Sequence, residues 1–205
     1  MTDTRIETLL AWWFADWTED GPMDWGSDPA LKRWWKADPA IDATIRERFG
    51  PWLEALRGPA GEAWAETPRG ALARVLLLDQ VSRVMHRGSG RAWENDAVAR
   101  ATVYAALEAG WDAQLEWIER QFLLMPLMHS EDRADHDRAE LEFARLAADT
   151  AGSQRAGNYT NLVDYEQKHR AIVDRFGRYP HRNALLGRES TPEEQAFLQE
   201  DGSSF

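Results

Sequence analysis

Apolar residues recur along this chain with the three- and four-residue spacing of amphipathic helices. No stretch alternates apolar and polar positions between turn signals, so we predict no strands. The first apolar stretch predicts a helix from Ile6 to Trp17. We predict further helices that begin at Asp28-Pro29 and at Asp38-Pro39 (ending at Gly50-Pro51), and others from Thr67-Pro68 to about His86, from Asn95 to Ala109, from Gln114 to Leu124 before Pro126, from Ser130 to Asp149, from near Thr160 to Gly177, and after the capping box Thr191-Pro192-Glu193-Glu194.

These elements amount to about eight to ten helices with short connections, which favours an all-α fold of stacked antiparallel helix pairs without a sheet. The clearest loop by composition is TAGSQRAG, residues 150–157. No self-similarity with a period of about 34 residues is present, so a helical-repeat fold has no support from internal repeats. We expect one domain over residues 1–205, with a helical body over 4–175 and a C-terminal motif with a capping helix over 175–200.

Composition narrows the classes of protein that fit. The chain has 205 residues, 43% of them hydrophobic, which is enough for a sizeable core. It has no cysteine, which excludes disulfides and thiolate metal sites. The net charge of −11 argues against a nucleic-acid or anionic-membrane partner. No apolar run approaches a membrane span and no leader pattern opens the chain, so we expect a cytoplasmic protein.

One helix changes character along its length. The segment GALARVLLLDQVSRVMHRG begins with apolar residues on all sides, which indicates burial. The face that contains Leu72 and Leu76 then becomes polar at Asp79 and Arg83. One interpretation is an ion pair between residues four apart where the helix emerges into solvent. The other is a polar pocket wall, because a buried charge requires partners.

The segment QFLLMPLMHSEDRADHDR passes from apolar to charged residues within a few positions. Ser130 is a plausible N-cap, and Glu131 suits the first turn of the helix that follows. His129 has no such role, and we interpret it either as an acid–base group or as a buried histidine with satisfied ring nitrogens. Asp132 and His136 lie four residues apart, but no diagnostic ligand spacing accompanies them. We therefore expect no metal and no cofactor.

Basic residues cluster near the C-terminus, around the segment RFGRYPHRNALLGRES. Residues 168–188 contain six Lys or Arg against Asp174 alone, a local net charge of +5. Gly177 suits the left-handed position that ends a helix, and Pro180 forces the residue before it to be extended. The basic side chains either pair with acidic helices of the same chain or hold a phosphate or carboxylate between guanidinium groups.

The chain contains eleven tryptophans, several times the ordinary frequency. The adjacent pairs Trp12-Trp13 and Trp34-Trp35 diverge on a helix, so the two members of a pair cannot share one face. Core packing with cation–π contacts from the arginines is one interpretation. A binding surface for a sugar or peptide is the other.

Four segments together resemble the bacterial family known as domain of unknown function 924. They are WWFADW, LLLDQVSRVMHRG, FLLMPLMHSED and HRAIVDRFGRYPHRNALLGRESTPEEQAFL, and the resemblance spans about residues 5–200. It implies a tetratricopeptide-like fold, a right-handed superhelix of helix pairs, and it implies no established reaction. The family's middle motif usually reads more like DQF-P-R-N, whereas this chain has Val81 and Ser82 at the Phe and Pro positions.

The residues selected above predict one site for a small phosphate- or carboxylate-bearing ligand, with hydrolytic or acid–base chemistry as its reaction class. The predicted catalytic residues are His129, His181 and Glu131, and the predicted ligand-binding residues are Asp79, Gln80, Arg83, His169, Arg175, Arg178, Arg182 and Asn183. The alternative is a tetratricopeptide-like peptide-binding module without catalysis. A third interpretation is that these residues only lock the C-terminal segment onto the bundle. A homodimer is compatible with all three.

Overall fold

The computed structural model describes residues 3–21, 24, 27–56 and 58–203. Helices are the regular structure throughout these residues, and no strand occurs in them. The predicted all-α class is therefore confirmed, while the right-handed superhelix stays a prediction. None of the helices in these ranges combines the length and the apolar content needed to cross a membrane.

The helices follow one another in a simple order. The α-helices are α1 (Thr4–Trp13), α2 (Pro29–Trp35), α3 (Pro39–Ala55), α4 (Pro59–Glu62), α5 (Pro68–Val75), α6 (Ser82–Met85), α7 (Asp96–Glu108), α8 (Trp117–Met128), α9 (Arg133–Asp149), α10 (Ala156–Phe176) and α11 (Pro192–Phe197). Tighter or wider helical turns are η1 (Ala63–Glu66), η2 (Leu76–Val81), η3 (Gly90–Trp93), η4 (Asp112–Gln114) and η5 (Pro180–Arg182).

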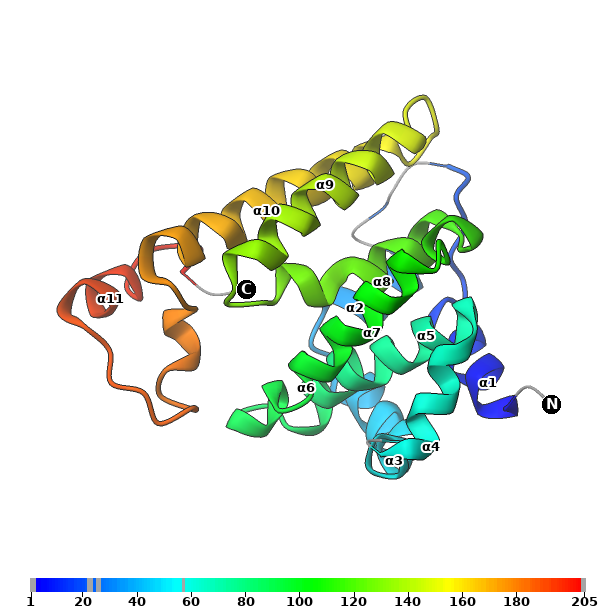
Figure 1. Cartoon of the computed structure of the whole chain (residues 1–205), viewed down its shortest axis with the longest axis horizontal. Helices are drawn as coiled ribbons and strands as arrows, with labels where there is room; N and C mark the ends of the chain where they lie inside the picture. The colour runs from blue at the N-terminus through cyan, green and yellow to red at the C-terminus, as the bar shows by residue number, and fades with distance from the viewer. Residues whose placement is uncertain (1–2, 22–23, 25–26, 57, 204–205) are drawn as a thin grey trace.

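The long helices α9 and α10 form an antiparallel hairpin along one side of the molecule (Figure 1). Helix α8 packs against α9, and α5 and α7 pack against α8, so α8 connects the hairpin to the helical body. Helix α11 lies beyond the C-terminal end of α10, away from the body (Figure 1). The α9–α10 hairpin is thus one antiparallel helix pair, while a stack of such pairs stays a prediction.

Two hydrophobic clusters stabilise this arrangement. The larger cluster joins α1, α2, α3, α5, η2, α7, α8 and the inner face of α9. A smaller cluster lies at the C-terminal end and contains Ile172, Val173, Tyr179 and Phe197, with Phe176 packed against it. The tryptophans serve mostly the first cluster, since Trp13 and Trp34 are buried. Among the described tryptophans, Trp35 is the one classed as exposed, at 40%.

Two predicted helix ends at proline are wrong. Helix α3 continues through Gly50-Pro51 to Ala55, and α8 continues through Pro126 to Met128. A proline inside a helix costs about 3 kcal/mol because it removes one hydrogen bond and crowds a carbonyl. The residues beyond each proline, Leu53 in α3 and Leu127 in α8, are fully buried, and each such leucine contributes about 2 kcal/mol. Burial of these last turns therefore offsets the local cost.

Other predicted boundaries shift by a few residues. The first helix ends at Trp13 rather than Trp17, and Asp16 adopts a left-handed conformation with φ of 67°. Helix α10 begins at Ala156 rather than near Thr160, which shortens the predicted loop. The helix that follows His129 is capped by Asp132, whose side chain accepts from the Ala134 N–H, and not by Ser130.

The predicted helix from Pro68 to His86 has the right extent but not the right interior. Residues Leu76–Val81 form a π-helix, η2, between α5 and α6. Asp79 and Arg83 still share one face across this wider turn, since they form an ion pair at 2.8 Å. π-Helical turns often occur at functional sites, and this one contains Asp79 and Gln80.

The predicted caps are confirmed elsewhere. Asp28, Asp38 and Thr67 each accept from backbone N–H groups of the helix they precede, and Thr191 and Glu194 form the predicted capping box. Gly177 ends α10 in the left-handed conformation, with φ of 68°. Gly177 sets where α10 ends and Thr191 sets where α11 begins, so these two caps fix the ends of the basic segment between the helices.

The basic segment contacts the body through a close approach at Gly90. A β-carbon on Gly90 would lie 2.6 Å from the Leu185 carbonyl oxygen and 3.2 Å from Leu186 Cδ2. Only a residue without a side chain fits against this backbone. The contact places the Leu185–Leu186 turn against η3.

We expect Gly90→Ala to lower the free energy of unfolding by about 1–3 kcal/mol, because a backbone carbonyl must move to admit the methyl group. The matched control is Gly157→Ala in α10, where a β-carbon would meet nothing within 4 Å. That change should leave stability the same or raise it by up to about 1 kcal/mol. Urea unfolding of both variants measures the difference, and equal stabilities would contradict the close contact.

Candidate functional site

A buried carboxylate lies at the centre of the candidate site. Asp79 on η2 is 1% exposed, and its Oδ1 is 2.8 Å from His129 Nδ1 and 2.8 Å from the Arg83 guanidinium. Its Oδ2 accepts from Gln80 Nε2 at 2.6 Å. Burial opposes ionisation, but the charges of Arg83 and His129 and these hydrogen bonds outweigh it, so the pKa of Asp79 is held below its usual value. The predicted ion pair between Asp79 and Arg83 is thus present, but its carboxylate is buried rather than at a solvent-exposed part of the helix, and the pocket wall stays a prediction.

His129 is oriented by this carboxylate. It follows the last residue of α8, and its backbone N–H donates to the Met125 carbonyl at 3.1 Å. With Asp79 ionised, ring nitrogen Nδ1 must carry the proton that the carboxylate accepts. When the ring is neutral, Nε2 holds its lone pair. The side chain is 15% exposed, so solvent or a small molecule can reach part of the ring.

Arg182 lies beside His129, and its buried positive charge has few hydrogen-bond acceptors and no carboxylate within hydrogen-bond distance among the described residues. The residue is 7% exposed, and its Nη2 donates to the His129 carbonyl at 2.9 Å. Its Nη1 is 3.7 Å from Asp96, and its Nε finds no acceptor among the described residues. Burial and the nearby charge of Arg83 lower the pKa of Arg182 to about 10. The guanidinium stacks on Tyr179, 4.5 Å from the ring centre.

Asp96 at the start of α7 connects the two guanidinium groups. Arg83 Nη1 donates to Asp96 Oδ1 at 3.1 Å and to the Ala92 carbonyl at 3.1 Å. Arg182 approaches the other oxygen of Asp96, so both guanidinium groups share this carboxylate. Of the two arginines, Arg83 is the one that also pairs with Asp79. The segment from Ala92 to Asp96 was not predicted as part of the site, and its only sequence signal was an acidic residue in the first turn of a helix.

Tyr179 joins the remaining histidines to this cluster. Its side chain is fully buried, its hydroxyl donates to the Met128 carbonyl at 2.7 Å, and its N–H donates to Glu131 Oε1 at 2.9 Å. Burial raises the pKa of Tyr179 above its usual value. The sequence predicts only an extended backbone at Tyr179, the residue before Pro180, although a large aromatic residue within a basic loop is also a signal for such a contact.

Two predicted histidines pack on the Tyr179 ring. His169 lies with its ring centre 5.9 Å from that of Tyr179 and 6.4 Å from that of His129, and its Nδ1–H donates to the Tyr165 carbonyl at 2.8 Å. Burial lowers the pKa of His169 to about 3. His181 lies 5.6 Å from Tyr179, and burial together with Arg182 lowers its pKa to about 4. His181 Nδ1 is buried and has no hydrogen-bond partner among the described residues.

A second buried pair lies behind Tyr179. His136 and Glu166 are both fully buried, with Nδ1 of the ring 2.6 Å from Oε1 and Nε2 2.9 Å from the Ser130 carbonyl. Both ring nitrogens face oxygen acceptors, and burial raises the pKa of Glu166 above its usual value. Burial opposes the charged ring, but the hydrogen bond and charge of Glu166 outweigh it and raise the pKa of His136. His136, which lies four residues after Asp132 in the sequence, thus pairs with Glu166.

The rest of the predicted set locks the basic segment in place. Arg178 forms two hydrogen bonds to Glu194, at 2.6 and 2.7 Å, and Arg175 pairs with Glu193 at 2.9 Å. The hydrogen bonds from Arg178 lower the pKa of Glu194 to about 2. Both arginines therefore engage α11 rather than the cluster around Asp79.

Glu131 and Asn183 are occupied in the same way. Arg188 holds the carboxylate of Glu131 with two hydrogen bonds, at 2.6 and 2.9 Å. Asn183 accepts from Arg188 Nε at 2.9 Å and donates to Ser190 Oγ at 3.0 Å. In the described part of the chain, no group of three or more acidic or histidine side chains is arranged to hold a metal ion. The structure thus brings together one subset of the predicted residues: Asp79, Gln80, Arg83, His129, His169 and Arg182, with His181 at the edge.

The comparisons with known proteins agree with this architecture. The family described as "Bacterial protein of unknown function (DUF924)" matches residues 9–202. The chain belongs to this family. The chain is also similar to a solved structure, "Structure of Protein of Unknown Function ATU0120 from Agrobacterium tumefaciens", which is 30% identical, with a TM-score of 0.77 over 96% of this chain and 97% of that one. None of the curated proteins matches the chain.

The first prediction from this site concerns the histidine tautomer. We expect His129 to be protonated at Nδ1 when neutral, because Asp79 accepts that proton. ¹⁵N-resolved NMR of the imidazole rings measures this directly. In Asp79→Asn the carboxylate is lost, and we expect the preference for Nδ1 to disappear. An Nε2-protonated ring in the unmodified protein would contradict the arrangement.

The second prediction concerns pH. Burial lowers the pKa of His169 from 6.5 to about 3. Below pH 6.5 the His169 ring is therefore protonated in the unfolded chain but stays neutral in the folded chain. Folding stability from this residue is therefore lost as pH falls through this range. We expect the stability difference between the unmodified protein and His169→Gln to shrink by up to about 1.4 kcal/mol per pH unit between about pH 6.5 and pH 5. Urea unfolding across that range measures it, and a constant difference would contradict a buried neutral ring.

Proposed function

We propose that the cluster around His129 binds a small anionic ligand that carries a phosphate or carboxylate, and that His129 acts there as an acid–base group. The observation that carries the proposal is the buried Arg182. A guanidinium has five N–H donors, and this one makes a single hydrogen bond and one long ion contact with described residues. A ligand oxyanion beside it would supply the missing acceptors through charge-assisted hydrogen bonds.

The position of His129 supports the chemical part of the proposal. Asp79 holds Nδ1, so Nε2 can accept a proton from a water molecule or from the ligand. The charge that then develops on the ring is stabilised by Asp79, which the surrounding donors keep ionised. The low pKa values of His169 and His181 make them neutral neighbours that add no competing charge near neutral pH. No activated serine accompanies the pair, since Ser130 donates to Asp135 at 2.5 Å, which favours proton transfer or attack by water.

This proposal keeps part of the predicted site and leaves the rest out. Arg83 and Arg182 provide the positive charge, whereas Arg175 and Arg178 engage glutamates of α11. Glu131 is neutralised by Arg188 and orders the loop. The peptide-binding alternative, a homodimer and a cytoplasmic location all stay predictions.

Inorganic phosphate is the simplest probe of the proposal. We expect calorimetry at constant ionic strength to detect phosphate binding, and Arg182→Gln to weaken it by about tenfold or more, since a hydrogen bond to a charged group is worth about 1.5–3 kcal/mol. The matched control is Arg175→Gln, from the same basic segment, whose side chain is 44% exposed and pairs with Glu193.

The control should bind phosphate as the unmodified protein does. Equal loss in both variants would indicate a general effect of charge and would contradict the proposed position of the ligand. Absence of phosphate and acetate binding in the unmodified protein would support the purely structural interpretation instead. Far-ultraviolet circular dichroism of each variant confirms that a loss of binding does not reflect a loss of fold.

A further inference from the structure

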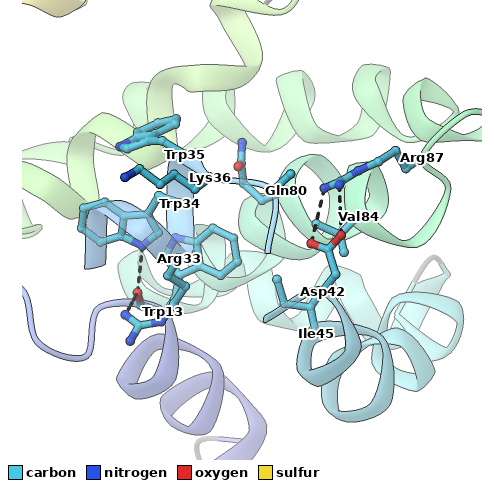
Figure 2. Close-up of a pocket in the computed structure, with 11 residues that line it drawn as sticks. Trp13, Arg33, Trp34, Trp35, Lys36, Asp42, Ile45, Gln80, Val84 and Arg87 are labelled. Carbon is cyan, nitrogen blue, oxygen red and sulfur yellow. Dashed lines mark hydrogen bonds and ion pairs between the residues drawn. The ribbon is translucent and has the colours of Figure 1, made fainter. Parts of the chain in front are cut away.

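A separate hollow opens between α2, α3 and the helix formed by η2 and α6 (Figure 2). It encloses about 260 Å³. Its wall consists of Trp13, Arg33, Trp34, Trp35, Lys36, Ala37, Asp42, Ile45, Gln80, Val84 and Arg87. Gln80 is the one wall residue that also belongs to the cluster around Asp79, so the hollow is a neighbour of that cluster and not a part of it.

One side of the hollow offers an aromatic surface. Trp35 is 40% exposed and stacks on Phe122 with ring centres 5.7 Å apart and planes within 10°. Phe122 covers one face of the indole, which leaves the other available. Trp34 is fixed beside it, because its Nε1–H donates to the Trp13 carbonyl at 2.9 Å. A rigid exposed indole favours a flat ring through offset stacking.

The cations of the hollow differ in how they are neutralised. Arg33 donates to the Ala15 carbonyl at 2.7 Å and to Asp16 at 2.9 Å, and Arg87 pairs with Asp42 at 3.0 Å. Lys36 is exposed and forms no ion pair with any described residue. Its ammonium is therefore the uncompensated positive charge of this wall, in a chain whose net charge is −11.

Gln80 contributes an amide to the wall of the hollow, and in Figure 2 the ammonium end of Lys36 points away from this amide, toward the side of Trp34 and Trp35. One of its N–H groups donates to Asp79 at 2.6 Å, and this bond fixes the orientation of the amide. The second N–H and the carbonyl oxygen are then left for a bound molecule. An aromatic face, an ammonium group and an amide donor around one small space together match a planar molecule with one carboxylate.

We propose that this hollow binds a small planar carboxylate, with its ring against Trp35 and its carboxylate at the Lys36 ammonium group. The volume lies just below the range of about 300–1,000 Å³ for ordinary ligand pockets, which suits one substituted ring rather than a nucleotide. Apart from Gln80, which borders both places, the proposal concerns different residues from those around His129 and Arg182. It holds whether or not that cluster binds an anion.

The test uses 4-fluorobenzoate and ¹⁹F NMR titration of the full-length chain. We expect binding of 4-fluorobenzoate, and binding weaker by about tenfold for the neutral isostere 4-fluorobenzamide, which lacks the charge that Lys36 recognises. We expect Lys36→Gln to weaken 4-fluorobenzoate binding by about the same factor and to leave the binding of the amide unchanged. Trp35→Ala should weaken both ligands.

Lys32→Gln is the matched control. Lys32 lies one turn earlier on α2 and borders an adjoining hollow that Lys36 does not line. Its replacement removes the same charge from the same helix, and we expect it to leave both affinities unchanged. Equal weakening in the two lysine variants would mean that only the overall charge of α2 matters and would overturn the proposal. Unchanged binding in Lys36→Gln, or equal affinity for the benzoate and the benzamide, would overturn it as well. Lys36 is exposed, so its variant should fold normally, and a thermal melt confirms this.

Discussion

A carboxylate buried as deeply as that of Asp79 can stay ionised only while donors from other parts of the chain reach it. That requirement connects α6, which supplies Arg83, to the end of α8, which supplies His129. Arg83 in turn depends on Asp96 at the start of α7. The wider turn of η2 places Asp79 where these groups meet, and removal of any one of them would weaken the compensation of a buried charge.

The basic segment between α10 and α11 divides into two groups with different tasks. Arg175, Arg178 and Arg188 form ion pairs with glutamates and fix the loop and α11 to the rest of the chain. Arg182 instead turns inward, stacks on Tyr179 and reaches the backbone at His129 with most of its donors unused. A concentration of one charge in a sequence can thus serve mainly for structure, while a single buried member of it, Arg182, is the one on which the proposed ligand site depends.

Much of the fold was predictable because it depends on local rules. The caps at Asp28, Asp38, Thr67 and Thr191 and the left-handed Gly177 follow from the conformations that these residues prefer. Continuation of α3 and α8 through proline was not predictable, because tertiary burial of the next turn decides it. The π-helix has no sequence signature either.

The candidate site shows the same division. Distant residues of suitable chemistry, such as His129 and Asp79, could be selected from the sequence. Their partners could not, because sequence alone does not reveal which of the many acidic side chains each arginine meets. Tyr179 was missed for that reason, since its importance comes from the rings and carbonyls that surround it.

The order of the chain has a consequence for how the site comes into being during synthesis. Asp79, Arg83 and His129 leave the ribosome well before Tyr179 and Arg182, which follow the long α9–α10 hairpin. Until then the His129 carbonyl lacks its hydrogen bond from Arg182. The Tyr179 ring, which packs against both His136 and His169, is also missing. The helical body can form its own large core at that stage, whereas the candidate site exists only in a chain whose final segment has folded back.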